Sequence, residues 1–341
     1  MADAMRFDIR YSCRFVYDDL VRESQNEVRV CPLTDAYQHL VTYRVHTTPP
    51  SRVLSFTDWW GTRVDAFGVR EPHLVLDVVA EATVETHPRP MVTTDPRATA
   101  LADPAFRDLH AEFLERTPHA NWGPSVGAEA GRLADQAGGG VVSQLLAIHR
   151  SVNSQLAYVP GSTYVGVGVD EVFERSEGVC QDFAHLAIAM CRSVGIPARY
   201  VSGFLFTSDD ATGSDDPGDI AGDVVEVQTH AWFEASVPGF GWVALDPTNG
   251  REVQLRHVAI GRGRDYDDVA PLKGVYAGVA GHELQTGVEI RRVGAPPPPA
   301  PPPPPTAGRT YGSPPGPRED RGQLQQQPMD AYQQQQQQQQ Q

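Results

Sequence analysis

The chain has 341 residues, of which 43 are acidic and 28 are basic, and its formal net charge is -15. This length allows two ordinary domains with additional material, and the negative charge disfavours nucleic acid or an anionic membrane surface as a partner. The sequence has no run of about 18 apolar residues and no basic segment followed by an apolar one at its start, so we expect a cytoplasmic protein that does not span a membrane.

The first part of the chain has the period-two pattern of half-buried strands. Apolar side chains alternate with mostly polar ones at Phe7, Ile9, Tyr11, Cys13, Phe15 and Tyr17. The pattern returns over residues 41–45 and 74–84 and ends before Pro88. Residues 1–87 are therefore predicted to form a small, β-rich N-terminal domain in which Cys13 is a buried apolar side chain.

The next segment, residues 88–140, is rich in Pro, Gly and Ala and is predicted to connect two domains, with a short helix near residues 106–114. Residues 142–152 then have apolar side chains at near-helical spacing, which predicts a second helix.

The most informative helix begins near Cys180. Its apolar residues recur at i, i+3, i+4, i+7, i+8 and i+11, which predicts one buried stripe: Phe183, Leu186, Ala187, Met190, Cys191 and Val194. Gly195 is a natural end for this helix. Residues 198–206, 223–237 and 241–245 are β-prone. This order predicts an α+β domain over residues 141–293.

The composition changes after residue 293. Residues 294–341 contain proline runs and a glutamine run from Gln333 to Gln341, which cannot bury a core. We predict a disordered tail with extended polyproline segments, through which partner proteins could bind.

Cys180 occupies the first turn of its predicted helix. Unpaired N–H groups and the positive end of the helix dipole stabilise a thiolate there, as a cysteine nucleophile requires. Cys191 lies eleven residues later, about 16 Å along the helix axis, so the two cannot form a disulfide, and we interpret Cys191 as core. Four cysteines in this chain do not suggest a disulfide framework.

A thiol nucleophile needs an imidazole and a third group that orients it. His230 lies in a β-prone run, and Asp246 ends the next one. The two would be directly opposite in an antiparallel hairpin with a five-residue loop over residues 236–240. A two-residue loop at 239–240 would place them on opposite faces of the sheet, so the triad hypothesis requires the longer loop.

Three segments resemble the transglutaminase-like superfamily, and within it the bacterial proteins that join a β-rich N-terminal region to a transglutaminase core. They are YVPGST at residues 158–163, GVCQDFAHLAIAMCRSVGIPARYVSGF at 178–204 and THAWFEASVPGFGWVALDPTNG at 229–250. Their order and approximate spacing match that family, and the resemblance extends over most of residues 5–293.

The resemblance implies a papain-like fold in which a central helix packs on an antiparallel sheet. It makes Cys180 the nucleophile, His230 the base and acid, and Asp246 the residue that orients His230. The implied reaction is attack on a carboxamide, typically a glutamine side chain of a protein or peptide, with release of ammonia and a thioester that an amine or water resolves. No cofactor and no metal are expected.

Further residues have weaker assignments. The Cys180 N–H and Tyr158 are candidate donors to the oxyanion. Trp232 is a candidate cleft residue, although aromatic side chains on adjacent strands are more often core. His185 lies about 140° round the helix from Cys180 and is not predicted to be the base. The acidic residues 208–219 lack the spacing of a calcium loop, which favours a solvated loop.

Three functional hypotheses remain open from the sequence. The first is a cysteine acyltransferase, and the second is a peptidase or amidase that uses the same triad. The third is a non-catalytic module that recruits partners, against which the three retained residues argue.

Overall fold

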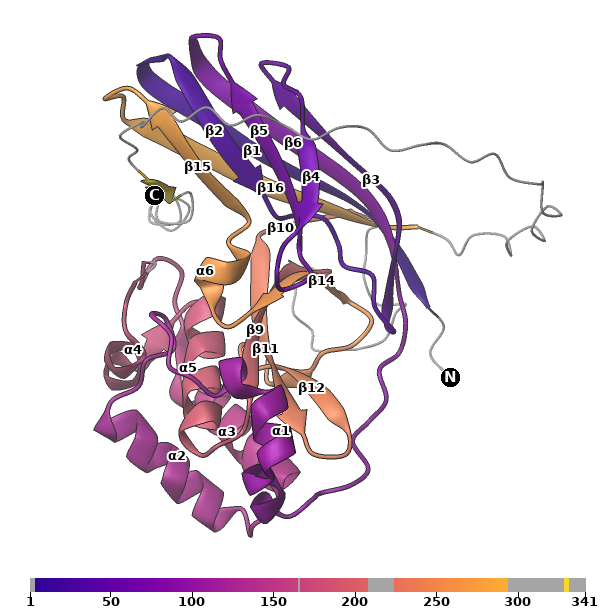
Figure 1. Cartoon of the computed structure of the whole chain (residues 1–341), viewed down its shortest axis with the longest axis vertical. Coiled ribbons are helices and arrows are strands. Elements are labelled where there is room, and N and C mark those ends of the chain that lie inside the picture. Colours follow the sequence, from indigo (N-terminus) through magenta and orange to yellow (C-terminus); the bar gives the residue numbers. More distant parts are fainter. Residues whose placement is uncertain (1–3, 165, 208–223, 294–327, 331–341) are drawn as a thin grey trace, which may run out of the picture.

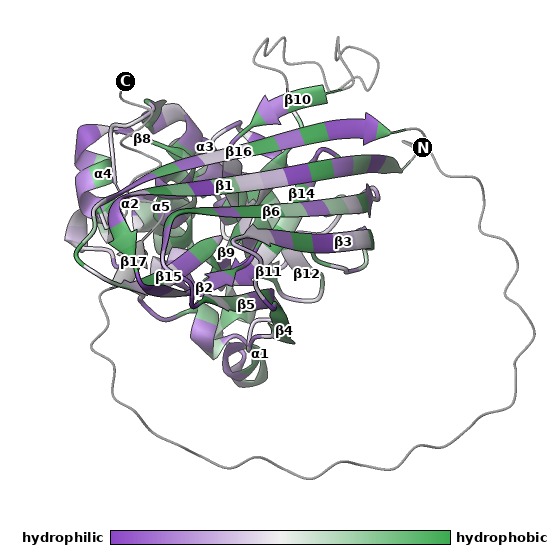
Figure 2. Cartoon of the chain, turned by 90° about the horizontal axis from the view of Figure 1, so that it is seen from above, coloured by the Kyte–Doolittle hydropathy of each residue, from purple (hydrophilic) through white to green (hydrophobic). Residues whose placement is uncertain are grey.

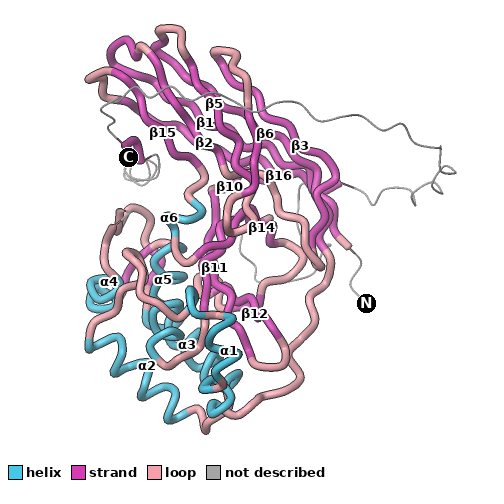
Figure 3. The backbone as a smooth tube through the Cα atoms, in the orientation of Figure 1, coloured by secondary structure: helices cyan, strands magenta, loops and turns pink. Residues whose placement is uncertain are grey.

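The computed structural model describes residues 4–164, 166–207, 224–293 and 328–330. In Figure 1, two sheets lie at one end of the molecule, and the helices gather around a third sheet at the other. Figure 3 shows the same division between a strand-rich end and a helix-rich end. The predicted α+β class with a β-rich N-terminal region is thereby confirmed.

Two antiparallel sheets form the strand-rich end. The first contains β1 (Met5–Val21), β3 (Gln38–Thr48), β6 (His73–Thr86), β10 (Val224–Val227) and β16 (His282–Val293) in the order β10-β16-β1-β6-β3. The second contains β2 (Glu23–Val28), β4 (Leu54–Thr57), β5 (Arg63–Val69), β15 (Leu272–Ala277) and β17 (Pro328–Asp330) in the order β17-β15-β2-β5-β4.

The alternation of apolar and polar residues in β1 matches the alternation of buried and exposed side chains, as predicted. The alternating apolar residues from Phe7 to Tyr17, Cys13 among them, are buried, whereas Asp8 and Arg10 between them are exposed. Figure 2 shows the resulting bands of hydrophobic and hydrophilic residues along β1 and its neighbours. The buried side chains form one cluster with residues of β2 and β5, so the two sheets share a core.

Strand pairing crosses the expected domain boundaries. β16 pairs with β1, with Ile9 opposite Ile290, and β15 pairs with β2. Residues 272–293 were predicted to belong to the second domain, residues 141–293, but their strands complete the N-terminal sheets. The predicted strand at 223–237 is likewise divided, since β10 joins β16 while the following strand stays in the third sheet.

The third sheet lies at the helix-rich end of the molecule. It contains β9 (Ala198–Leu205), β11 (Thr229–Val237), β12 (Gly241–Asp246), β13 (Arg251–Glu252) and β14 (His257–Gly263) in the order β13-β12-β11-β9-β14. A separate parallel pair joins β7 (Ala157–Tyr158) to β8 (Glu177–Gly178).

Helices surround this sheet. They are α1 (Pro104–Leu109), α2 (Pro124–Gln136), α3 (Val141–Gln155), α4 (Val169–Arg175), α5 (Cys180–Ser193) and α6 (Tyr266–Val269), with 3-10 turns at Ala98–Ala102 and Ala111–Phe113. α2 falls in the segment predicted to be only a connection, where its internal glycines weaken the helical signal.

The central helix α5 is more buried than its pattern predicts. Every residue from Cys180 to Arg192 is buried, because α5 packs against β9 and β11 and also against α2, α3 and α4. A single apolar stripe indicates one covered face. Arg192 lies outside that stripe, yet it is also buried, and it donates to the carbonyl of Ala198.

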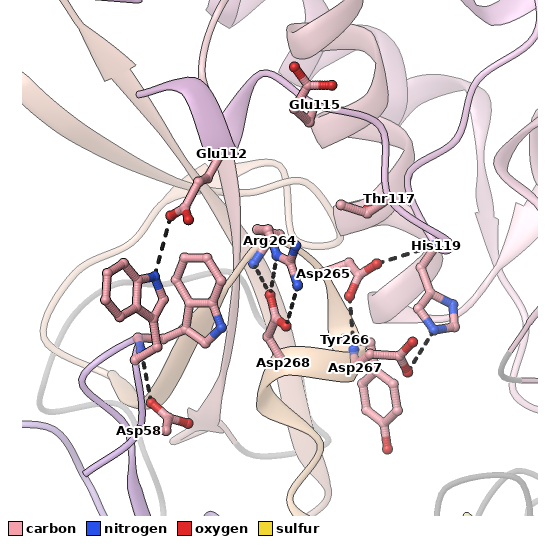
Figure 4. Close-up of polar contacts among 12 residues, drawn as sticks. Asp58, Glu112, Glu115, Thr117, His119, Arg264, Asp265, Tyr266, Asp267 and Asp268 are labelled. Atoms are coloured by element: carbon pink, nitrogen blue, oxygen red, sulfur yellow. Dashed lines mark hydrogen bonds and ion pairs between the residues drawn. The ribbon is translucent and has the colours of Figure 1, made fainter. Parts of the chain in front are cut away.

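Polar contacts join the two ends of the molecule next to α6 (Figure 4). His119 contacts the Asp267 carboxylate at 3.0 Å, and its ring stacks on that of His185 at 5.3 Å. The indole N–H of Trp59, from the N-terminal region, lies 3.5 Å from the Glu112 carboxylate. These contacts hold the segment before α2 between the sheets and the core.

Two predicted features lie largely outside the described residues. The acidic segment 208–219 is one, and the tail at 294–341 is the other, except that Pro328–Asp330 form β17 beside β15. Among the helices of the described residues, none combines the length and the apolar character that crossing a membrane requires.

Candidate active site

Cys180 is the first residue of α5. The side chain of Asp182 accepts the backbone N–H of Val179 at 2.8 Å and the Thr163 hydroxyl at 2.5 Å, which ties the helix start to the preceding loop. Burial raises the pKa of Asp182 to about 6, although both hydrogen bonds oppose the rise. The predicted place of Cys180 at a helix N-terminus is confirmed, and the residue is 6% exposed.

The other three cysteines differ from Cys180. Cys13 and Cys31 lie in the N-terminal region, Cys191 lies in the last turn of α5, and all three are buried and free. Burial raises the pKa of Cys31 to about 12 and raises those of Cys13 and Cys191 strongly as well. These three are therefore neutral thiols at physiological pH.

His230 is the second residue of β11, where it is paired with Gly203 of β9. Its Nε2 lies 2.8 Å from Oδ2 of Asp246, and Cys180 is near enough to its ring to influence the pKa of the imidazole. Burial alone lowers the pKa of His230, but the Asp246 carboxylate and the Cys180 contact raise it to about 10. The imidazole therefore carries a proton at neutral pH.

The β11–β12 hairpin differs from the predicted register. Ala235 pairs with Val243 and Val237 with Gly241, so the loop contains three residues, 238–240. The prediction of a five-residue loop over residues 236–240 is therefore wrong. The observed register differs from the predicted one by two residues, so each side chain stays on the same face of the sheet. His230 and Asp246 therefore lie on one face as diagonal neighbours. Their side chains meet across that diagonal.

Asp246 is completely buried, and both of its carboxylate oxygens accept hydrogen bonds. Its Oδ1 accepts the backbone N–H groups of Thr248 and Asn249, and its Oδ2 also accepts the Asn249 side-chain amide at 2.7 Å. His149 of α3 donates to its backbone carbonyl. Burial alone would raise the pKa of Asp246, but the charge and the hydrogen bond of His230 hold it well below its usual range.

A second histidine at Asp246 was missed by the sequence analysis. His257, the first residue of β14, places its Nε2 3.2 Å from Oδ2 of Asp246. Nothing in its local pattern indicates this, because the contact depends on β14 pairing with β9. One ligand atom from each of His230, Asp246 and His257 lies within 4.8 Å of the others, so these residues could also hold a metal ion.

The two weaker candidates have different positions. Tyr158 is half exposed, and the β7–β8 pairing sets it beside Gly178, two residues before Cys180. Burial, and then the Cys180 charge, raise the pKa of Tyr158 to about 12. Trp232 is completely buried and packs edge-on against His257 at 5.3 Å, so it is a core residue beneath the site and does not line a cleft.

His185 is excluded as the base by its own contacts. It is buried, its ring stacks on Tyr200, and its Nε2 accepts the backbone N–H of Tyr266. Burial lowers the pKa of His185 well below its usual range, so it is neutral.

The comparisons with known proteins agree with this geometry. Residues 131–247 match the family model of the transglutaminase-like superfamily, and residues 7–85 match that of the bacterial transglutaminase-like N-terminal region. An uncharacterized protein of Mycobacterium leprae is 36% identical over 288 residues, covering 84% of this chain and 99% of that protein.

A solved structure and a named enzyme are also similar. The crystal structure of a candidate cysteine protease from Cytophaga hutchinsonii is 25% identical, with a TM-score of 0.65 and coverage of 86% of this chain and 92% of that one. A protein-glutamine gamma-glutamyltransferase of Pseudomonas aeruginosa is 34% identical over 82 residues, which are 24% of this chain and 11% of that protein. With both of its regions matched and a relative aligned over almost its entire length, the chain belongs to the transglutaminase-like superfamily.

Proposed function

We propose that the protein is a cysteine acyltransferase that acts on carboxamides, typically glutamine side chains of proteins or peptides. The observation that carries this proposal is the hydrogen-bonded pair of His230 and Asp246 beside Cys180, with the pKa of His230 raised to about 10. A protonated imidazole next to a helix N-terminus stabilises a thiolate at neutral pH.

The reaction follows from these protonation states. The Cys180 thiolate attacks the carboxamide carbon and forms the C–S bond. The His230 imidazolium then protonates the leaving nitrogen, the C–N bond breaks, and ammonia departs from a thioester. An amine attacks the thioester, His230 takes the amine proton, and the C–S bond breaks to regenerate the thiolate. Asp246 keeps Nε2 of the imidazole engaged throughout.

The developing oxyanion needs hydrogen-bond donors. The first N–H groups of a helix have no intrahelical acceptor, which makes the Cys180 N–H one donor in this proposal. The hydroxyl of Tyr158 is the second. Its raised pKa keeps it protonated beside the thiolate, as a donor must be.

A second candidate function is hydrolysis of peptide or amide bonds by the same thioester route, with water as the acceptor. The similarity to the candidate cysteine protease of Cytophaga hutchinsonii over 86% of the chain favours it. No cofactor enters either reaction as proposed. Partner binding through residues 294–341 stays a prediction.

Incubation with a glutamine-containing peptide and a labelled primary amine separates the two candidates. Incorporation of the amine with release of ammonia supports the transferase. Ammonia or peptide fragments without incorporation support the hydrolase. The sequence has one lysine, Lys273, so cross-linking between copies of the chain competes little with the labelled amine. C180A is the matched control and is expected to be inactive in both assays.

Alkylation by iodoacetamide tests the nucleophile without a substrate. Cys180 is expected to react at least about tenfold faster at pH 7 than the three buried thiols, because only thiolates react at useful rates. Equal or slower alkylation of Cys180 contradicts the enzyme proposal and supports a non-catalytic module.

A further inference from the structure

Two histidines contact the same oxygen of the Asp246 carboxylate. Oδ2 lies 2.8 Å from Nε2 of His230 and 3.2 Å from Nε2 of His257. The His257 side chain is 3% exposed, and Asp246 is completely buried. The second histidine is thus enclosed together with Asp246.

The tautomer of His257 follows from its other ring nitrogen. Nδ1 faces the backbone N–H of Gln254 at 3.4 Å and can only accept there. Nε2 must therefore carry the ring proton and donate it to Asp246. His257 is a neutral donor in this arrangement.

The surroundings favour this neutral form. Burial lowers the pKa of His257, Asp246 opposes that shift, and the nearby charges of His230 and Arg89 lower the pKa further. Trp232 packs its indole against the ring. Two positive imidazolium rings at one carboxylate oxygen would repel each other at this distance. With His257 neutral, the negative charge of Asp246 pairs with the imidazolium of His230 alone.

We propose that His257 is a positioning residue for the Cys180–His230–Asp246 triad, donating a hydrogen bond that fixes the Asp246 carboxylate in the orientation that His230 needs. The inference rests on the proposed function, since it assigns His257 a role in the same reaction. A carboxylate held by one fewer donor can rotate away from Nε2 of His230, which weakens the thiolate–imidazolium pair.

The test compares H257A with H257Q. Glutamine can place an amide N–H near the position of Nε2, whereas alanine removes the donor. H110A is the matched control, because His110 is also buried and its ring contacts Ser236 of the same strand β11, away from the triad. For each variant the measurements are kcat and KM for amine incorporation, the pH dependence of Cys180 alkylation by iodoacetamide, and Tm.

H257A is expected to lower kcat about 10- to 100-fold, the factor that one hydrogen bond to a charged group is worth, with KM changed less than about twofold. The acid limb of its alkylation profile is expected to move to higher pH. H257Q should recover most of both losses. H110A is expected to lower Tm and to leave the alkylation profile unchanged.

Other results overturn the inference. Equal losses in H257A and H257Q, or an H257A profile that matches the unmodified protein, would leave His257 with a packing role only. A stoichiometric zinc ion that EDTA removes together with activity, and that H257A no longer binds, would make His257 a metal ligand instead. If Cys180 of the unmodified protein is not preferentially alkylated, the proposed function itself fails, whatever the His257 variants do.

Discussion

Replacing Glu234 with glutamine is expected to destabilise the core at neutral pH by about 3 kcal/mol. Glu234 lies in β11, four residues after His230, and is 1% exposed. Its carboxylate contacts Arg199 at 2.5 Å, Arg262 at 3.0 Å and Arg89 at 3.8 Å. Glutamine keeps the shape but removes the charge that these arginines share.

The magnitude follows from the pKa of the carboxyl group. Burial by itself raises the pKa of Glu234, but Arg262, Arg199 and Arg89 outweigh it and lower the value from 4.5 to about 2. At about 1.4 kcal/mol per pKa unit, the shift corresponds to roughly 3 kcal/mol of stability. Removing one partner of a buried ion pair costs about 3–5 kcal/mol, which is consistent with this value.

The pH dependence gives an independent check. Because the folded pKa lies below the unfolded one, the contribution is fully present above about pH 5 and is lost as the pH falls toward 2. About 2 of the 3 kcal/mol should be gone by pH 3. The difference in unfolding free energy between the unmodified protein and E234Q is therefore expected to shrink from pH 7 to pH 3.

Urea unfolding at a series of pH values measures this difference. E171Q is the control, since Glu171 pairs with Arg175 on the surface, with side chains 47% and 49% exposed. Such a pair contributes no more than about 0.5 kcal/mol. If E234Q is as stable as the unmodified protein at pH 7, or if the two stabilities run parallel between pH 7 and pH 3, the network does not stabilise the charged carboxylate.

Two further substitutions test the site and the packing beneath it. D246N removes the charge that raises the pKa of His230, so kcat and the rate of Cys180 alkylation at pH 7 are expected to fall, kcat by about 10³- to 10⁴-fold; an unchanged alkylation rate would contradict the triad. G203A places a Cβ 2.3 Å from the ring of Trp232 and is expected to lower the unfolding free energy by about 1–3 kcal/mol. G131A, in open space on α2, should instead raise Tm slightly, and equal effects of the two glycine variants would refute the packing argument.

Local patterns were sufficient for several elements. The alternation from Phe7 to Tyr17 predicts β1, and the helical spacing after Cys180 predicts α5, because each pattern records which side chains face a core. The place of Cys180 at a helix N-terminus could be seen in the same way. The family resemblance then identified His230 and Asp246 among many histidines and acidic residues.

Other features depend on contacts between distant segments. β16 completes the sheet beside β1, where His282 pairs with Tyr17, although 260 residues lie between the end of β1 at Val21 and the start of β16 at His282. The three-residue hairpin loop was not predicted, since a Pro-Gly segment is compatible with several loop lengths. Arg192 and Glu234 have charged side chains that sequence patterns place on the surface, yet tertiary partners allow both to be buried.

By itself, the sequence determined the α+β class and the main core elements, and through the family resemblance it predicted the three candidate triad residues. Those features are encoded in short-range periodicity and in motifs whose residues are close in the chain. Only the tertiary structure decided which donors surround Asp246. Two of these donors, His257 of β14 and His149 of α3, come from segments distant in the chain. The partners of a side chain depend on how strands and helices pack. Contacts between residues of distant segments leave no periodic pattern in the sequence.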